Sequence, residues 1–262
     1  MNPVAFLWSR APETGAKDWL RAQVYSLKAG KTAHFSFRAG VFVTEVQQTR
    51  LRTYDHPFFL PTAQKQYQQR HKIREGEVVI DAGAYNGHLS IYFASKVGRA
   101  GRVIAIEPDS ANLRRLRENL ALNPDLQNAV VVECMLWDRV ETVEFCEQGT
   151  GASSAFWMPD GIARKRKETT TLDSIVQEMN LSRLDFIKMD IEGAEVKALA
   201  GARQTIERFR PNFAIASYHV AEGERTLPRV EQALGEYGYE VETLFFGREC
   251  ITFGTAHRDT AC

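Results

Sequence analysis

The sequence predicts an α/β fold in which a mostly parallel sheet has helices on both faces and follows an N-terminal extension. From Glu77 onward, short apolar runs alternate with helical patterns, the order that builds a parallel sheet. The run Val78–Ile80 is β-branched and apolar, as is typical of a central strand buried on both faces. Residues 1–74 lack this alternation. We therefore expect an extension over residues 1–74 and a ligand-binding domain over residues 75–262.

Length, charge and cysteine content narrow the class of protein. With 262 residues, 44% of them apolar, the chain can bury a substantial core. Basic and acidic residues balance at 33 each, so we expect no nucleic-acid partner. No apolar run approaches the roughly 18 residues of a membrane span, and Val4–Trp8 is too short for a signal peptide, so a cytoplasmic protein is expected. Four cysteines without a CxxC pair are expected as reduced thiols: Cys134, Cys146, Cys250 and Cys262.

The N-terminal extension carries its own local patterns. Residues 19–27 fit a short helix, and residues 33–37 and 41–46 fit a hairpin that turns at Arg38–Gly40. Such an extension is expected to cap the substrate pocket, to form a homo-oligomer surface or to add a structural layer to the sheet. The sequence leaves these three alternatives open.

The chain is organised around Glu77–Gly87, a buried strand that runs into a glycine turn. A helix over His88–Val97 follows, with an apolar face that packs back on the sheet. Gly83 and Gly87 allow a sharp turn and a close approach of backbone to ligand. This arrangement predicts a pocket of the nucleotide-binding type.

The composition of the turn indicates which ligand it holds. A dinucleotide fingerprint needs three glycines as GxGxxG, whereas this turn reads Asp81-x-Gly-x-x-x-Gly. Asp81 disfavours a pyrophosphate and favours a cationic or hydroxyl-rich ligand. The strand over residues 102–106 ends at Glu107, which is well placed to accept hydrogen bonds from ribose hydroxyls. S-adenosylmethionine fits, since it has a ribose and an amino acid end but no phosphate.

The middle of the domain continues the alternation. Asp109 or Ser110 is expected to cap a helix, and Ala129–Glu133 is expected as the third strand. Strands near Val140–Cys146 and Glu168–Thr171 should bracket a loop over Glu147–Lys167. We expect this long loop to be a mobile cover near the substrate, and its basic run, Arg164–Lys167, to be a solvated face rather than an anion site.

The last elements complete the sheet. The expected elements are a helix over Leu172–Met179, a fourth strand over Leu184–Met189, a fifth over Asn212–Ser217, a helix over Arg225–Tyr237 and closing strands over Tyr239–Leu244 and Glu249–Phe253. Asp190 follows the fourth strand, with Glu192 and Glu195 expected on the next helix. His219 follows the fifth strand, where a histidine is a candidate general base.

Three residues are candidates for catalysis. His219 and Asp190 are the expected proton acceptors, and Lys188 is the third candidate. Asp190 and Glu192 offer hard oxygen ligands, so a divalent metal is possible. Because the sequence shows no clear third ligand, no metal is predicted.

Several motifs together resemble the FkbM family of S-adenosylmethionine-dependent methyltransferases, over roughly Glu77 to Phe253. The motifs are Asp81–Gly87 with Ser90, Glu107–Asp109, Glu118–Leu120 and Phe186–Glu195. The resemblance implies a Rossmann-like class I methyltransferase with a seven-stranded sheet and an antiparallel closing strand. It also implies O-methylation of a small hydroxylated acceptor, such as a sugar, lipid or natural product, with S-adenosylhomocysteine as product.

The resemblance also suggests where the cofactor is held. Asp138, beyond the third strand, is expected to accept a hydrogen bond from the adenine amino group or to be a simple turn residue. Tyr85 stands where the family usually has asparagine, and it is expected to change how the methionine end of the cofactor is bound. The expected cofactor-binding residues are Asp81, Gly83, Ala84, Tyr85, Gly87, Glu107, Pro108, Leu136, Asp138 and Asp190.

Two other classes of function stay open. A nicotinamide-dependent oxidoreductase shares the sheet, although the missing middle glycine and Asp81 disfavour it. A non-catalytic cofactor-binding or scaffold protein would keep the pocket without a working base.

Overall fold

A computed structural model describes residues 15–159, 161–162 and 164–256, so Val4–Trp8 and Cys262 lie outside the described residues. The chain divides into two compact units, residues 1–61 and 62–262. The division falls at residue 61 rather than near 74, because helix α3 (Leu60–Tyr67) contributes its polar side chains to the second unit. For example, Tyr92 donates a hydrogen bond to Gln64 at 3.2 Å.

The first unit contains the expected helix and hairpin. Its elements are α2 (Gly15–Ala29), β1 (Ala33–Arg38), β2 (Val41–Val46) and β3 (Thr49–Thr53). The hairpin turns at Ala39 and Gly40, both with positive φ, and its strands pair antiparallel. The third strand, β3, was not expected from the sequence and pairs antiparallel with β2. Ser26 fixes α2 to β1, because its hydroxyl both donates to and accepts from the backbone of Phe35.

The second unit is built on a seven-stranded sheet in the order β14-β15-β11-β10-β4-β5-β6. These strands are β4 (Val78–Ala82), β5 (Arg102–Ile106), β6 (Ala129–Val132), β10 (Phe186–Met189), β11 (Asn212–Ala216), β14 (Glu240–Phe246) and β15 (Glu249–Thr255). The pairs from β11 through β6 are parallel, and β15 runs antiparallel to both its neighbours. The expected mostly parallel sheet with an antiparallel closing strand is confirmed.

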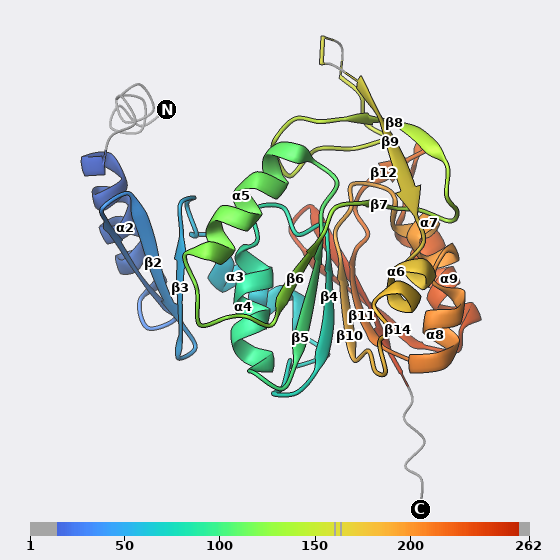
Figure 1. Cartoon of the computed structure of the whole chain (residues 1–262), viewed down its shortest axis with the longest axis horizontal. Coiled ribbons are helices and arrows are strands. Elements are labelled where there is room, and N and C mark those ends of the chain that lie inside the picture. The colour runs from blue at the N-terminus through green and yellow to red at the C-terminus, as the bar shows by residue number, and fades with distance from the viewer. Residues whose placement is uncertain (1–14, 160, 163, 257–262) are drawn as a thin grey trace, which may run out of the picture. The chain divides into compact units, whose positions relative to one another are not determined.

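Helices cover both faces of this sheet (Figure 1). They are α4 (His88–Val97), α5 (Ser110–Ala121), α6 (Leu172–Glu178), α7 (Glu195–Ala200), α8 (Arg203–Phe209) and α9 (Leu227–Glu236). Helices α6 to α9 enclose a core with alternate strand residues such as Ile80, Ile187 and Ile215. Helix α5 packs Leu113 and Leu116 near the opposite side of the strands. Burial on both faces explains why the strands are almost uniformly apolar.

A smaller sheet lies between β6 and α6 along the chain. It consists of β7 (Met135–Leu136), β9 (Arg164–Thr170) and β8 (Thr142–Cys146), with β9 in the centre. The basic run therefore belongs to a strand, which corrects the expectation that it lies in a loop. Lys165 and Lys167 both form ion pairs with Glu147, so these two cations are partly neutralised by the protein itself.

Two segments near the sheet edge also differ from expectation. Glu192 lies in a turn with a positive φ of 53° and precedes α7, so it is not helical. The short strands β12 (Val220–Ala221) and β13 (Glu224–Arg225) form a hairpin, which delays the start of α9 to Leu227. Among the helices that the structure describes, none has the length and apolarity to span a bilayer.

Candidate active site

The glycine turn follows β4 and depends on close backbone packing. Gly83 has a φ of 75°, and a Cβ atom there would lie 1.8 Å from the carbonyl oxygen of Asp190. At Gly87, with a φ of 84°, a Cβ would lie 2.3 Å from Leu116. Tyr85 adopts a φ of 52° without being glycine, which is a strained conformation. At positions 83 and 87 a larger residue is thus disfavoured for two reasons: its Cβ atom would clash with neighbouring atoms, and the backbone has a positive φ.

The amides of the turn are already used within the protein. The N–H groups of Gly83 and Ala84 both donate to the carbonyl oxygen of Ile106 at 3.0 Å. The N–H group of Tyr85 donates to Glu107 at 2.8 Å. A pyrophosphate-binding turn presents such amides to the ligand instead. The geometry of residues 83–85 therefore favours a ligand without phosphate.

Glu107 is the acid at the end of β5, and it is nearly buried, with 5% of its surface exposed. Besides the amide of Tyr85, it accepts hydrogen bonds from the amide of Asp109 and the side chain of Asn112. Burial raises the pKa of the Glu107 carboxyl, and these hydrogen bonds oppose the rise. The structure thus joins Glu107 to the glycine turn, and its contact with a ribose stays a prediction.

Asp81 and Lys188 form a buried pair below the turn. They are opposite residues of the neighbouring parallel strands β4 and β10, and their side chains approach to 3.0 Å. Asp81 also accepts a hydrogen bond from Ser90, and Lys188 donates to the carbonyl oxygens of Ala82 and Gly83. Both side chains are at most 3% exposed. The Lys188 amine is thus held by Asp81 and by the turn, and the catalytic role suggested for it stays a prediction.

The other expected cofactor-binding residues lie around the same edge of the sheet. Pro108 follows Glu107 and is half-buried, while Leu136 in β7 is buried. The Oδ2 atom of Asp138 contacts Lys197 at 3.0 Å. The Oδ1 atom of Asp138 is buried and has no hydrogen-bond partner among the described residues. An acceptor atom of this kind suits the role expected for Asp138 toward an adenine amino group.

Asp190 follows β10 and is linked to helix α3. The hydroxyl of Tyr67 donates to Asp190 Oδ2 at 2.8 Å. Burial and the neighbouring Asp190 carboxylate raise the pKa of Tyr67 well above its usual value. Tyr67 therefore stays protonated and acts as a fixed hydrogen-bond donor. The other oxygen of Asp190, Oδ1, is buried and has no hydrogen bond among the described residues.

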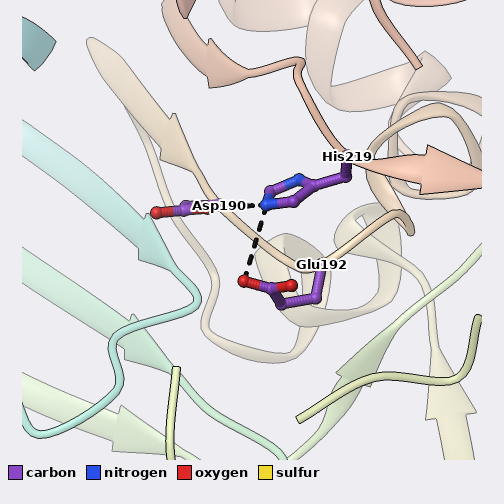
Figure 2. A group of neighbouring side chains, drawn as sticks. All are labelled: Asp190, Glu192 and His219. Atoms are coloured by element: carbon purple, nitrogen blue, oxygen red, sulfur yellow. Dashed lines mark ion pairs between the residues drawn. The ribbon is translucent and has the colours of Figure 1, made fainter. Parts of the chain in front are cut away.

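His219, Asp190 and Glu192 converge at the carboxyl edge of the sheet, as Figure 2 shows. The Nε2 atom of His219 lies 3.4 Å from Asp190 Oδ1 and 3.5 Å from Glu192 Oε1. On the other side of the ring, His219 Nδ1 lies 2.8 Å from Glu195 Oε1. The described part of the chain thus brings together two predicted catalytic residues and adds two acids around the imidazole.

The surrounding acids determine the protonation of His219. Burial alone lowers the pKa of its imidazole, but Glu192, Glu195 and Asp190 outweigh burial and raise the pKa to about 11. The three acids thus favour the protonated imidazole. The role of general base that the sequence suggests for His219 stays a prediction.

The segment after β8 packs against this group. Ser154 donates a hydrogen bond to the carbonyl oxygen of Glu192 at 2.7 Å. Phe156 stacks on Trp137 with ring centroids 5.4 Å apart, and its ring also lies near Gly193. Part of the expected mobile cover is thus in contact with the turn that carries Glu192.

Sequence reasoning missed two residues that define the site. Tyr67 lies in a polar, glutamine-rich stretch, and only the helical spacing of Gln64, Tyr67 and Gln68, all buried, could have indicated an inward polar face. Glu195 was expected on the helix after Asp190, and it begins α7. It is also fully buried and accepts from His219 and from the amides of Ile191 and Gly193.

The fold is that of the class I methyltransferases. A solved FkbM methyltransferase from Methylobacillus flagellatus superposes with a TM-score of 0.54 at 24% identity, covering 72% of this chain. The superposition spans 47% of that protein, so this chain corresponds to about half of its length.

The sequence comparison defines the family. Residues 81–241 match the methyltransferase FkbM domain, and the chain belongs to the FkbM methyltransferase family. The chain is 23% identical to the methyltransferase sdnD of Sordaria araneosa, over 62% of this chain and 73% of the relative. It is 26% identical to the 2-O-methyltransferase NoeI of Sinorhizobium fredii, over 62% of this chain and 74% of the relative.

Proposed function

We propose that this protein transfers a methyl group from S-adenosylmethionine to a hydroxyl of a small molecule. The observation that carries the proposal is the hydrogen bond from the amide of Tyr85 to Glu107. It fixes a buried carboxylate beside the glycine turn, where a ribose needs an acceptor and a phosphate would be repelled. Membership of the FkbM methyltransferase family supports the same ligand.

The turn also argues against a nicotinamide dinucleotide. Its amides at residues 83–85 donate to Ile106 and Glu107. A pyrophosphate would need those donors. S-adenosylmethionine needs instead an acceptor for its ribose hydroxyls and one for its adenine amino group, and Glu107 and Asp138 are suited to these two tasks.

Methyl transfer is an in-line displacement, so the protein chiefly aligns acceptor oxygen, methyl carbon and sulfur and keeps water away. The acceptor hydroxyl loses its proton as the bond to carbon forms. Asp190, Glu192 and His219 lie at the sheet edge beside the turn, where such an acceptor would be held. The relative named a 2-O-methyltransferase supports oxygen as the atom methylated. A sugar, lipid or natural product is the substrate class that the resemblance to the FkbM family implies.

Calorimetric titration of the purified chain with S-adenosylmethionine and with S-adenosylhomocysteine tests the proposal. We expect micromolar binding that Glu107→Ala weakens at least tenfold, because the ribose loses its acceptor. The matched control is Glu133→Gln, an exposed acid that follows β6 and pairs with Arg117. The control should bind as tightly as the unmodified chain.

Two results would count against the proposal. A folded protein that binds neither ligand is not an S-adenosylmethionine-dependent enzyme. A protein that binds both ligands but transfers no methyl group to a panel of sugars, hydroxylated lipids and polyketides would support the scaffold alternative.

A further inference from the structure

The group formed by Asp190, Glu192 and His219 has the features of a cation site. One ligand atom from each residue lies within 4.8 Å of the other two. Donor atoms that share a cation at about 2.1 Å lie roughly 3 to 4 Å apart. The distances of 3.4 Å and 3.5 Å from His219 Nε2 to the two carboxylates fall in this range.

Buried polar atoms without partners point into this group. His219 is 7% exposed, and its Nε2 atom forms no hydrogen bond among the described residues. Asp190 Oδ1, which faces it, is likewise buried and without a hydrogen bond. The two atoms lie 3.4 Å apart as an ion pair without hydrogen-bond geometry, whereas buried polar atoms are normally fully satisfied. A cation that replaces the Nε2 proton accepts electron pairs from both at once.

The surroundings hold each ligand in place. Glu195 accepts from His219 Nδ1, which orients the ring with Nε2 toward the two carboxylates. A carboxylate behind a histidine is the usual support for a metal-binding imidazole. Tyr67 fixes Asp190 through Oδ2, and Ser154 fixes the backbone of Glu192. The three side chains are thus arranged in advance of any ligand.

We propose that Asp190, Glu192 and His219 bind a divalent cation, and that this cation in turn binds the acceptor hydroxyl. One imidazole with two carboxylates suits Mn²⁺ or a similar first-row ion. Three protein ligands leave coordination positions open for oxygen atoms of the substrate. Acceptors with two adjacent hydroxyls, which chelate a cation, are the substrate class that this site favours.

The cation accounts for the loss of the hydroxyl proton without a side-chain base. An oxygen bound to a divalent cation releases its proton to water more readily. The resulting oxygen forms the bond to the methyl carbon, and the carbon–sulfur bond breaks with its electrons left on sulfur. This role of the site rests on the proposed methyl transfer, whereas cation binding itself does not.

Titration of the chelator-treated full chain with MnCl₂, followed by electron paramagnetic resonance, tests the site. We expect one Mn²⁺ per chain with a dissociation constant in the micromolar range. Glu192→Gln should weaken binding at least tenfold, and Glu195→Gln should weaken it about 10- to 100-fold by releasing the imidazole. Nitrogen hyperfine coupling to the bound ion should disappear in His219→Gln.

The matched control is Glu222→Gln, which alters an exposed acid three residues after His219 that pairs with Arg229. It should bind Mn²⁺ as the unmodified chain does. Glu192 is partly exposed, so Glu192→Gln tests the site even if a substitution at buried His219 prevents folding.

Titration of the same samples with S-adenosylmethionine separates the two proposals. A folded chain that binds S-adenosylmethionine but not Mn²⁺ overturns the cation site and leaves the methyltransferase. Mn²⁺ binding that Glu192→Gln does not weaken also overturns it. A chain that binds Mn²⁺ at these residues but not S-adenosylmethionine keeps the cation site and overturns the proposed methyl transfer.

Discussion

At the scale of single residues, the site depends on how closely β4 and β10 approach. The turn after β4 passes so near the end of β10 that the hydrogen of Gly83 is all that fits beside the carbonyl oxygen of Asp190. The same contact places the backbone of Asp190 against the turn that is proposed to hold the cofactor. Gly83 thus lies between the residues proposed to hold the cofactor and those proposed to hold the acceptor.

Gly83→Ala should therefore destabilise the protein strongly. The new Cβ atom would clash with the carbonyl oxygen of Asp190, and alanine is also disfavoured in the left-handed backbone conformation. We therefore expect a loss of about 3 kcal/mol or more in the free energy of unfolding. Urea denaturation measures this loss. Gly76→Ala is the matched control, because Gly76 has a similar φ of 82° but open space around its Cβ position. The control should lose only about 1 to 2 kcal/mol, and equal losses would contradict the close-approach argument.

At the scale of elements, Glu147 joins strand β9 to the start of helix α5. It forms ion pairs with Lys165 and Lys167, and it accepts hydrogen bonds from the amide and hydroxyl of Ser110. Lys167 also donates to the carbonyl oxygen of Pro108, next to Glu107. The small sheet is thereby attached to the segment that carries the proposed ribose acceptor.

The stabilisation by Glu147 should depend on pH. Burial raises the pKa of its carboxyl, but hydrogen bonds from Lys165, Lys167 and Ser110 outweigh burial and lower the pKa from 4.5 to about 2. A lowered folded-state pKa contributes stability that is complete above the unfolded value and is lost as pH falls toward the folded value. Glu147→Gln should therefore lower Tm at pH 7, with a difference that narrows between about pH 4.5 and 2.

Thermal unfolding at pH 7, 5 and 3 measures this difference. Glu144→Gln is the control, since Glu144 forms an exposed ion pair with Arg164 in the same small sheet, and surface pairs contribute at most about 1 kcal/mol. A Glu147→Gln effect that stays constant over the whole range would show that its carboxylate charge does not carry the stabilisation.

At the scale of the whole molecule, the described residues of the candidate site all belong to the unit that begins after Pro61. Helix α3, at the start of this unit, supplies Tyr67 to Asp190 and Gln64 to Tyr92. Those contacts join α3 to the second unit, whereas the sequence predicts an extension over residues 1–74.

A fragment of residues 57–262 should therefore fold and bind S-adenosylmethionine within about threefold of the full chain. A fragment of residues 75–262 lacks α3 and should bind at least tenfold more weakly, a loss of about 1.4 kcal/mol. Calorimetry measures binding, and near-ultraviolet circular dichroism reports whether each fragment is folded. Equal binding by the two fragments would mean that α3 is dispensable and that the functional boundary lies near residue 74.

Much of the fold was predictable because its signals are local. Buried strands such as Val78–Ile80 and the glycine turn can be recognised from residues that are adjacent in the sequence. The same holds for the N-cap of α5, where Asp109 accepts hydrogen bonds from the amides of Ala111 and Asn112. The strand that contains Arg164–Lys167 was missed because its stability comes from pairing with β7 and β8. Charged side chains on an exposed strand give no apolar alternation to recognise.

By itself, the sequence determined the order of the strands in the large sheet and of most helices that cover it, the glycine turn and the acids at the ends of two strands, because these features follow from periodicity and backbone preference. Only the tertiary structure decided what each polar group does. Lys188 is buried against Asp81 because parallel strands place the two residues opposite each other. Tyr67 and His219 contact Asp190, and Glu195 contacts His219, across separations of up to 123 residues. Contacts of that range have no signature in a single sequence.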